Sequence, residues 1–417
     1  MTDACGLDFG TSNSAIGIVQ GGVATLAPLE QGQPLLPSAI FFDFELGRPL
    51  YGAEAIETYM NGTDGRLMRA LKSILASPLV KESTRLKERW ITLESVIGLF
   101  VGELKARAEA TLGRSIAAVV HGRPVHFVDG DAAGDRFAED TLASIARRAG
   151  FREVSFQYEP LAAARAFEAR VERETLALIC DLGGGTSDFS IVRLSPDRRE
   201  LSERMDDILA TFGIRLGGTD LDRLLSLDAA MPLLGLGSRL HTKDLPLPRL
   251  LFGELAHWPS INQLYTPSNR RLVRELHADA IEPAKTARLK TVLEHRLGHR
   301  LALAVEAVKI ALSDADAAPL DMTFIEPDLS PAVERDHFED AIADEGERLA
   351  AAVRETLRRS GVSAEAIGTV FLTGGSARVP ALRKAIASLV PPSRFARGDD
   401  LLSVAQGLTE EARLRYR

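Results

Sequence analysis

One short pattern occurs twice in this chain of 417 residues, and it limits the possible folds more than any other feature. The segments ACGLDFGTSNSAIGIV and ALICDLGGGTSDFSIV align so that Asp8 matches Asp181 and Gly10 matches Gly183. Each copy has an apolar strand, a turn rich in glycine and hydroxyl residues, and a second strand, which is the signature of a β-hairpin. A repeat with so long an offset predicts two similar α/β lobes that present their hairpins to one ligand, rather than a solenoid of short repeats.

The segments that follow the first hairpin alternate between strand and helix patterns. Residues 116–127 read as a strand, residues 131–150 as a helix with Asp131 near its N-cap, and residues 154–159 as the next strand. Pro160 suits the first turn of a further helix, because its missing N–H is harmless there. Strands that alternate with helices predict largely parallel sheets with helices outside them.

The second half of the chain is less regular. Residues 217–300 combine weak helical patterns with proline-rich stretches, and we expect a helical subdomain with a substantial loop. Amphipathic periodicity predicts a helix over residues 299–315 and one longer helix over residues 333–361. A strand at residues 369–373 follows.

Charge and hydropathy exclude several functions. The formal net charge is −8, and no cluster of lysine and arginine is interleaved with aromatic residues, so nucleic acid is not expected as a partner. No basic region precedes a long apolar stretch at the N-terminus, and no apolar run approaches the roughly 20 residues of a membrane span. We therefore expect a cytoplasmic protein without a membrane partner. Cys5 and Cys180 lie in apolar strand patterns and read as small buried side chains.

The two repeated turns have the composition of a phosphate clamp. Glycine lets backbone N–H groups approach a polyanion closely, and hydroxyl and amide side chains add further donors. A single glycine turn beside an aspartate is usually only a tight hairpin, but two turns in register favour a ligand site. The candidate phosphate-binding residues are Gly10, Thr11, Ser12, Asn13, Gly183, Gly184, Gly185 and Thr186.

Three aspartates accompany these turns. Asp8, Asp181 and Asp188 would repel phosphate directly. They fit instead as ligands, through water, of a Mg²⁺ ion that bridges the β- and γ-phosphates of a nucleotide.

A third glycine turn follows the strand predicted at residues 369–373. Gly374 and Gly375 leave the strand and Ser376 opens a helix, with Arg378 close by. A glycine pair in this position is usually only a packing turn. As the third such turn in the chain, it favours a flat floor for a base or sugar.

Together these segments resemble the actin-like ATPase superfamily and, within it, the nucleotide-binding domain of the seventy-kilodalton heat-shock chaperones. GLDFGTSNS is similar to that family's first phosphate motif, CDLGGGTSDFSIV to its second, EPLAAARAF to the helix near its hinge, and LTGGSARVPAL to its adenosine motif. The resemblance extends from Gly6 to Gly407. It implies a two-lobed actin-like α/β fold of duplicated ribonuclease H-like domains, with mixed sheets flanked by helices.

The resemblance also implies domain boundaries. Each lobe would have an inner and an outer subdomain. The implied ranges are lobe I at 1–168 with its outer part at about 31–94, a C-terminal helix at 392–417 that completes lobe I, and lobe II at 169–391 with its outer part at about 216–338.

Further site residues follow from the resemblance alone. Lys72 matches a lysine that reaches the γ-phosphate and the attacking water, although without the resemblance a solvated helix lysine would be the preferred interpretation. Glu159 and Pro160 match a hinge pair whose glutamate orders the water shell of the metal. The implied catalytic set is Lys72, Asp8, Glu159, Asp181 and Thr186. The implied nucleotide contacts beyond the twin turns are Gly217, Gly218, Glu306, Lys309, Ser313, Gly374, Gly375, Ser376 and Arg378.

Three positions depart from the family pattern. The arginine expected to stack on adenine is Ile310, which implies weaker or altered base selectivity. The valine expected before Pro124 is Arg123. Near the C-terminus the chain lacks the asparagine and proline that precede the family's aspartate, which leaves Asp399 or Asp400 as its counterpart.

The resemblance implies a weak magnesium-dependent ATPase that binds ATP and ADP and switches between open and closed lobes. A co-chaperone or nucleotide-exchange factor is the implied partner, and we expect a monomer. Only ten residues follow Gly407, so we expect a short member of the family without its peptide-binding domain.

Two other functions remain open from the sequence. Sugar kinases of the same superfamily share both phosphate hairpins, but no aspartate here has the context of a base beside an acceptor hydroxyl. A nucleotide-switched scaffold or filament subunit is the third interpretation, and sedimentation with and without ATP would distinguish it.

Overall fold

The structure is a computed structural model that describes residues 3–75, 77–127, 131–168, 171–201, 204–242, 244–396 and 402–416. The chain divides into two compact units, each described here by itself. Unit 1 comprises Met1–Arg215, Leu349–Ala377 and Ile386–Arg417, and unit 2 comprises Leu216–Arg348 and Arg378–Ala385.

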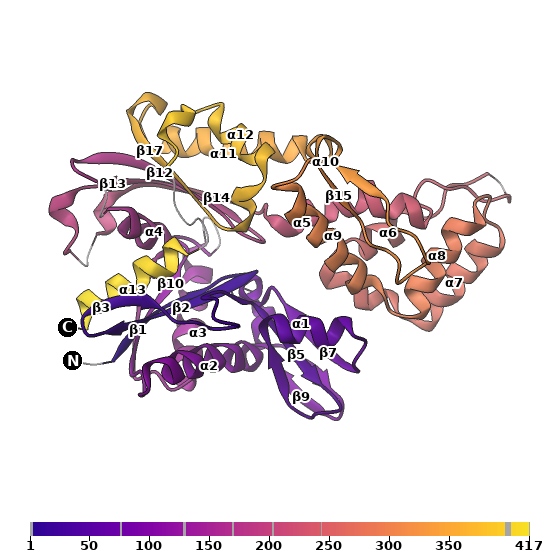
Figure 1. Ribbon diagram of the computed structural model, residues 1–417, viewed down its shortest axis with the longest axis horizontal. Helices are drawn as coiled ribbons and strands as arrows, with labels where there is room; N and C mark the ends of the chain where they lie inside the picture. The colour runs from indigo at the N-terminus through magenta and orange to yellow at the C-terminus, as the bar shows by residue number, and fades with distance from the viewer. Residues whose placement is uncertain are drawn as a thin grey trace. The chain divides into compact units, whose positions relative to one another are not determined.

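The first sheet of unit 1 is built around the N-terminal hairpin (Figure 1). Its strand order is β11-β10-β1-β2-β3, and the short β4 pairs with β2. β1, β10 and β11 run parallel, whereas β1, β2 and β3 are antiparallel. The strands are β1 (Ala4–Phe9), β2 (Asn13–Gln20), β3 (Val23–Leu26), β4 (Leu36–Pro37), β10 (Ala118–Arg123) and β11 (Glu153–Tyr158).

The second sheet of unit 1 repeats this plan. Its order is β14-β13-β12-β17, with only β12 and β17 parallel. The strands are β12 (Thr175–Leu182), β13 (Ser187–Leu194), β14 (Ile208–Ile214) and β17 (Ile367–Thr373). The mixed sheets that the resemblance implies are confirmed. The expectation of largely parallel sheets is wrong, because each repeated hairpin contributes an antiparallel pair.

The two hairpins also share one register. Asp8 lies opposite Ala15 in the first, and Asp181 lies opposite Asp188 in the second. Ala15 and Asp188 are equivalent positions of the repeat, so the sequence duplication is also a structural one.

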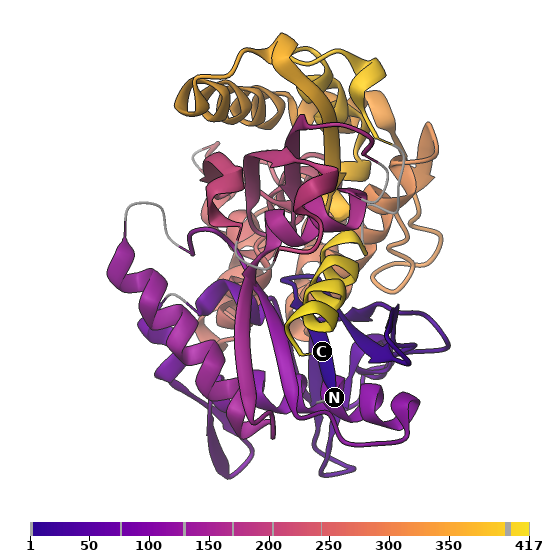
Figure 2. The same ribbon diagram turned by 90° about the vertical axis from the view of Figure 1, so that its left-hand side faces the viewer.

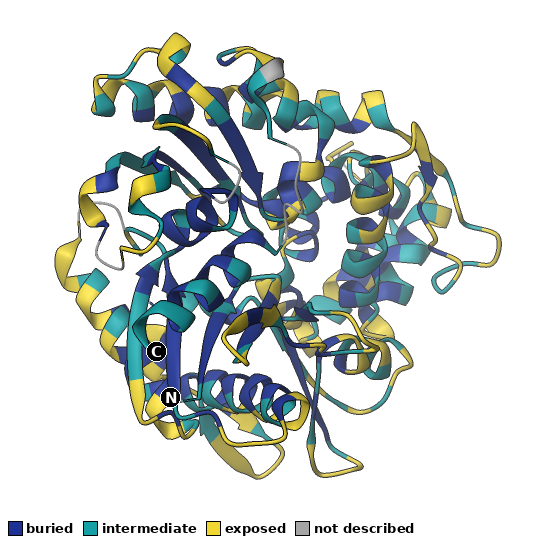
Figure 3. Cartoon of the chain, turned by 60° about the vertical axis from the view of Figure 1, so that its left-hand side comes forward, coloured by how far each residue is buried: buried dark blue, intermediate teal, exposed yellow. Residues whose placement is uncertain are grey.

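Two helices join the sheets in a common core. α4 (Glu159–Glu168) and α13 (Ser403–Arg415) contribute buried side chains that cluster with residues from both sheets. Phe167 of α4, for example, stacks on Phe371 of β17 at 3.9 Å between ring centroids. α13 packs against β1 and β2 as well as α4, and it crosses beside the first sheet in Figure 2. The central strands β1, β10, β12 and β13 are buried along most of their length, whereas the outer helices have exposed faces (Figure 3).

The other face of the first sheet is covered by α2 (Leu93–Leu112) and α3 (Ala132–Arg148). Asp131 caps α3, because its side chain accepts hydrogen bonds from the backbone N–H groups of Ala133 and Gly134 at 3.1 and 2.9 Å. The predicted N-cap is therefore confirmed.

A smaller part of unit 1 follows β4. It contains a three-stranded antiparallel sheet in the order β6-β5-β7 and a separate hairpin of β8 and β9. Its elements are β5 (Ala39–Asp43), β6 (Pro49–Tyr51), α1 (Gly52–Met60), β7 (Gly65–Arg69), β8 (Ser83–Leu86) and β9 (Arg89–Thr92).

Unit 2 is mainly helical, as the patterning of residues 217–300 predicts. A π-helical turn at Ser226–Ala230 and a 3₁₀ turn at Trp258–Leu264 interrupt it. The regular elements are α5 (Gly218–Leu225), α6 (Arg249–Leu255), α7 (Pro267–Ala278), α8 (Pro283–Glu294), α9 (Gly298–Leu312), β15 (Ala317–Pro319), β16 (Ala332–Glu334) and α10 (Arg335–Ala341).

The single long helix expected over residues 333–361 is wrong. Ile342 leaves helical geometry, with φ −108° and ψ 12°, and separates α10 from α11 (Ala343–Ser360). Ile342 is buried, so the apolar period continues through the break and periodicity alone could not reveal it.

Both cysteines are buried and free. Burial raises the pKa of the Cys5 and Cys180 thiols above the usual range, which keeps them protonated. Within the described residues, no helix is both long enough and apolar enough to cross a membrane.

Candidate functional site

The twin turns meet within unit 1. A Cβ on Gly184 would lie 2.1 Å from Ser12 Oγ, so the absence of a side chain at residue 184 lets the second turn approach Ser12 of the first turn in its present conformation. Ser38 braces the first turn by donating a hydrogen bond to the carbonyl oxygen of Gly10 at 2.8 Å. The second turn is closed by the backbone N–H of Gly183, which donates to the Thr186 carbonyl at 2.9 Å.

The third glycine turn joins the second. Ser376 Oγ donates a hydrogen bond to the Gly183 carbonyl at 2.9 Å. Gly374 has φ +81°, and a Cβ there would lie 2.3 Å from the Leu182 carbonyl oxygen, so only glycine fits. A 3₁₀ turn, Gly375–Arg378, and then α12 (Pro380–Ala387) follow it.

A lysine lies among the carboxylates beside the turns. Lys72, on the 3₁₀ turn Leu71–Ile74, places Nζ 2.7 Å from Glu159 Oε1 at the start of α4. Its side chain is 17% exposed, so it is not a solvated surface lysine. Burial alone lowers the pKa of Lys72, but Glu159, Asp8 and Asp181 outweigh this effect and hold it above its usual range.

The three aspartates have strongly raised pKa values. Burial, and then the nearby Glu159, raises the pKa of Asp8 to about 7 and that of Asp181 to about 6. Burial, followed by Asp181, raises the pKa of Asp188 to about 7. The cluster therefore contains more carboxylates than Lys72 neutralises, and a further cation would favour their ionised forms.

The donor set fits a hydrated metal ion. Among the described residues, no three His, Cys, Asp or Glu side chains lie close enough together to hold a metal ion directly. Mg²⁺ prefers oxygen ligands and keeps several of its waters. The carboxylates of Asp8, Asp181 and Asp188, beside the glycine turns, suit such an ion held through its waters.

The other predicted contacts lie in unit 2. Glu306, Lys309, Ile310 and Ser313 follow helical spacing along one side of α9 and its C-cap. Lys309 Nζ lies 2.8 Å from Asp222 Oδ1 and donates to the Gly218 carbonyl at 3.2 Å, which fixes α9 to the start of α5.

Two local contacts complete the unit 2 set. The Gly217 N–H donates to Asp220 Oδ2 at 2.9 Å, and Arg378 lies 3.3 Å from Asp314. Asp222 was not singled out from the sequence, although the motif GGTDLD contains it.

The structure thus brings one set of predicted residues together in unit 1 and another in unit 2. Ser38 was also missed by sequence reasoning, because it lies 28 residues from Gly10 and has no local signal. Asp399 and Asp400 lie outside the described residues. The unit 1 set is Asp8, Gly10, Thr11, Ser12, Asn13, Lys72, Glu159, Asp181, Gly183, Gly184, Gly185, Thr186, Asp188, Gly374, Gly375 and Ser376.

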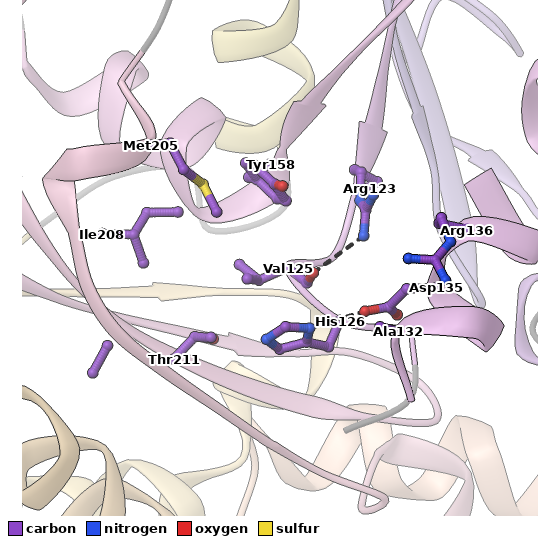
Figure 4. A pocket seen from close by; sticks show the side chains of 11 residues that line it. Arg123, Val125, His126, Ala132, Asp135, Arg136, Tyr158, Met205, Ile208 and Thr211 are labelled. Atoms are coloured by element: carbon purple, nitrogen blue, oxygen red, sulfur yellow. Dashed lines mark hydrogen bonds and ion pairs between the residues drawn. The ribbon is translucent and has the colours of Figure 1, made fainter. Parts of the chain in front are cut away.

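A separate cavity of about 380 Å³ lies in unit 1 between β10, α3, β11 and β14 (Figure 4). None of the residues predicted to bind nucleotide lines it. His126 Nδ1 lies 2.9 Å from Asp135 Oδ2 at one wall, and Met205 lies on another. Arg123, which replaces the expected valine, stacks over Tyr158 at 5.2 Å and donates to the Val125 carbonyl at 3.1 Å.

Comparison with known proteins identifies a family and several relatives. The family model described as Hsp70 protein matches residues 72–228 and 275–402. The chain is 28% identical over 400 residues to the chaperone protein HscA of Klebsiella pneumoniae strain 342. The matched region covers 92% of this chain and 53% of that relative. It is 28% identical over 424 residues to HscA of Escherichia fergusonii, covering 97% of this chain and 57% of that protein.

An HscA homolog of Shewanella sp. strain MR-4 is 27% identical over 401 residues, covering 92% of this chain and 54% of the homolog. The chain spans about half the length of these curated relatives. The family match, with mixed sheets flanked by helices, confirms the expected two-lobed actin-like ATPase fold class. The chain belongs to the Hsp70 protein family.

Proposed function

We propose that this chain is a magnesium-dependent ATP-binding module that hydrolyses ATP slowly. The main support is the meeting of the two repeated turns beside Lys72, Glu159 and three aspartates with raised pKa values. Two glycine turns with one register provide paired arrays of backbone donors for a chain of phosphates. The Hsp70 family match favours this function over a sugar kinase.

In this proposal the turns hold the phosphate groups from two sides. The backbone at Gly184 and Gly185 faces the phosphates, while the Gly183 N–H closes the turn by donating to the Thr186 carbonyl. Thr11 and Ser12 add hydroxyl donors. Thr186 Oγ1 already donates to Asp188 Oδ2 at 3.1 Å, so its hydroxyl is oriented by the second hairpin. The third turn, at Gly374, supplies the floor for the nucleoside.

Lys72 positions the attacking water and the γ-phosphate. Its ammonium is held by Glu159, so it needs little reorganisation during the reaction. Asp8 or Asp181 accepts the proton of the attacking water, since a carboxylate with a pKa of about 6 or 7 is well matched to this task near neutral pH. Asp8, Asp181 and Asp188 would hold Mg²⁺ through its waters, and the bound ion supplies neutralisation of phosphate charge.

We also propose that nucleotide state changes the arrangement of the two lobes, with the Glu159–Pro160 pair at the hinge. Glu159 contacts Lys72 at the site and begins α4, whose side chains belong to the core shared by both sheets. A monomer that works with a co-chaperone or a nucleotide-exchange factor is the organisation that we expect.

Calorimetry tests the binding proposal. We expect Mg²⁺ to raise the affinity for ATP by about ten-fold, because it offsets the repulsion between phosphate and the aspartates. Titrations with ATP and ADP, each with Mg²⁺ and with a chelator, measure this change. Equal affinity in both conditions would reject the proposed metal role, and no binding of either nucleotide would reject the function.

A second test concerns the base. Ile310 is 57% exposed on α9, at the position where the family resemblance places an arginine that stacks on adenine. Ile310→Arg is therefore expected to tighten ATP binding by about five-fold, since a guanidinium over an aromatic ring contributes about 1 kcal/mol. The matched control is Leu272→Arg on α7, which should leave ATP affinity unchanged. A tightening that is the same for both variants would indicate a general charge effect instead of base stacking.

A further inference from the structure

Unit 2 has a groove of about 620 Å³ that none of the proposed nucleotide residues lines. It lies between α5 with the following π-helical turn, α6 and α10. Its apolar lining is dominated by four leucines, and we call it the leucine groove. These leucines are Leu224, Leu227, Leu236 and Leu250.

The leucine groove exposes side chains that unit 2 does not need for its own core. On α6, Leu251, Phe252 and Leu255 are buried, whereas Leu250 is 74% exposed. A single exposed leucine is ordinary, but Leu250 lies beside the half-buried Leu224, Leu227 and Leu236 in one hollow, and together they form an apolar surface suited to a partner.

Two unpaired arginines flank this apolar surface. Arg223 and Arg249 line the groove, and neither forms an ion pair with any residue that the structure describes. The acidic group on the lining, Asp228, lies 2.9 Å from His337 Nε2. These two guanidinium groups beside the apolar lining favour a partner with carboxylates.

The floor of the groove is open at Gly253. A Cβ added there would meet no atom within 4 Å, so the fold itself does not require glycine at this position. Glycine within a helix is less favourable than alanine by about 0.5 to 1 kcal/mol. The bare backbone lets another chain approach α6 closely.

We propose that the leucine groove docks an amphipathic α-helix of a partner protein. Apolar side chains at helical spacing would fill the groove, and carboxylates beside them would pair with Arg223 and Arg249. An apolar groove between helices, with charges at its edge, is the surface on which such a helix binds. The docked helix lies apart from the proposed nucleotide contacts of unit 2, and so this interaction goes beyond ATP binding.

Fluorescence anisotropy of a labelled synthetic peptide tests the proposal on the full chain. The probe is a helical peptide of about 16 residues, with leucines at i, i+3, i+4 and i+7 and glutamates beside them. A companion peptide has lysine in place of every glutamate. We expect the acidic peptide to bind about ten-fold more tightly than the lysine peptide, and its affinity to fall as salt rises.

Three variants locate the binding. The double variant Arg223→Glu and Arg249→Glu is expected to bind the acidic peptide about ten-fold more weakly, because like charges then repel. Gly253→Met places a side chain in the groove and should weaken binding of the acidic peptide by a similar factor. Thermal unfolding of this variant checks that the fold is retained. Arg271→Glu on α7 is the matched control, because Arg271 is exposed and does not line the groove, and it should leave binding unchanged.

The proposal is overturned if neither peptide binds, if both peptides bind equally, or if the groove variants bind the acidic peptide as the native chain does. Sedimentation equilibrium of the chain alone gives a further decisive outcome. Self-association that Gly253→Met abolishes would assign the groove to a second copy of this chain and would also overturn the proposal.

Discussion

Replacing Lys72 with methionine is expected to slow ATP hydrolysis by about 10² to 10³-fold, while ATP affinity changes by much less. The ammonium lies 2.7 Å from Glu159 and is the counter-charge to Asp8 and Asp181 in the nucleotide-free protein. Methionine keeps most of the apolar stem but removes the charge that orients the attacking water. Binding depends mainly on the turns, which the substitution does not touch.

Single-turnover measurement separates this effect on chemistry from effects on binding and product release. Lys81→Met is the matched control, since Lys81 also pairs with a glutamate, Glu94, at 2.5 Å, but lies away from the turns. Glu94 keeps Arg148 as a second partner in that variant. If Lys72→Met hydrolyses ATP at the native rate, Lys72 has no part in the reaction.

Without nucleotide or metal, the protein should lose stability as the pH rises from about 4 to about 7. Asp8 and Asp188 have pKa values raised from 3.8 to about 7, and Asp181 to about 6, chiefly by burial. The folded state therefore holds more protons than the unfolded state in this window, and stability falls wherever the folded state binds more protons. The stability that the protonated carboxylates contribute is complete below pH 4 and is lost above pH 7.

Thermal unfolding in a pH series measures this loss. The midpoint is expected to fall by roughly 10 °C across the window, since the raised pKa values correspond to about 10 kcal/mol in total and about 1 kcal/mol lowers the midpoint of a chain this long by about 1 °C. Saturating Mg²⁺ and ATP should restore stability most at pH 8, because the metal binds the ionised carboxylates.

Asp188→Asn should flatten the pH dependence, because it removes one of the three carboxylates whose pKa is raised. Asp340→Asn, on the exposed side of α10, is the control and should leave the slope unchanged. A native chain whose stability rises between pH 5 and pH 7 would mean that these carboxylates ionise freely in the folded protein.

The hairpins could be predicted from the sequence because their information is local. The repeat aligns Asp8 with Asp181 in the sequence, and the turn residues between the strands fix the register of each hairpin. The family resemblance added the fold class, which the Hsp70 match confirms. The cap of α3 at Asp131 is another local signal that the structure confirms.

The contact between Lys72 and Glu159 could not be predicted from pattern alone. The two residues are 87 positions apart, and Lys72 lies in a short 3₁₀ turn that has no periodicity of its own. Only the resemblance indicated this lysine. Burial among carboxylates depends on tertiary structure, so the raised pKa values of the aspartates could not be predicted from composition or residue spacing either.

Unit 2 shows a different limit. A π-helical turn at Ser226–Ala230 and a 3₁₀ turn at Trp258–Leu264 break the helical period, so residues 217–300 gave only a weak pattern. The leucine groove results from how these irregular turns bring α5, α6 and α10 together, and no single segment of sequence carries it.

The packing of α13 has a consequence during synthesis. β1 begins at Ala4, yet the helix that covers it spans Ser403–Arg415, with Leu408 among the fully buried residues of their common core. At about 5 to 20 residues per second, a ribosome takes about 20 to 80 s to make the intervening chain. During that time the face of the first sheet that α13 covers lacks this helix, so its apolar side chains remain exposed on the nascent chain until the C-terminal residues are made.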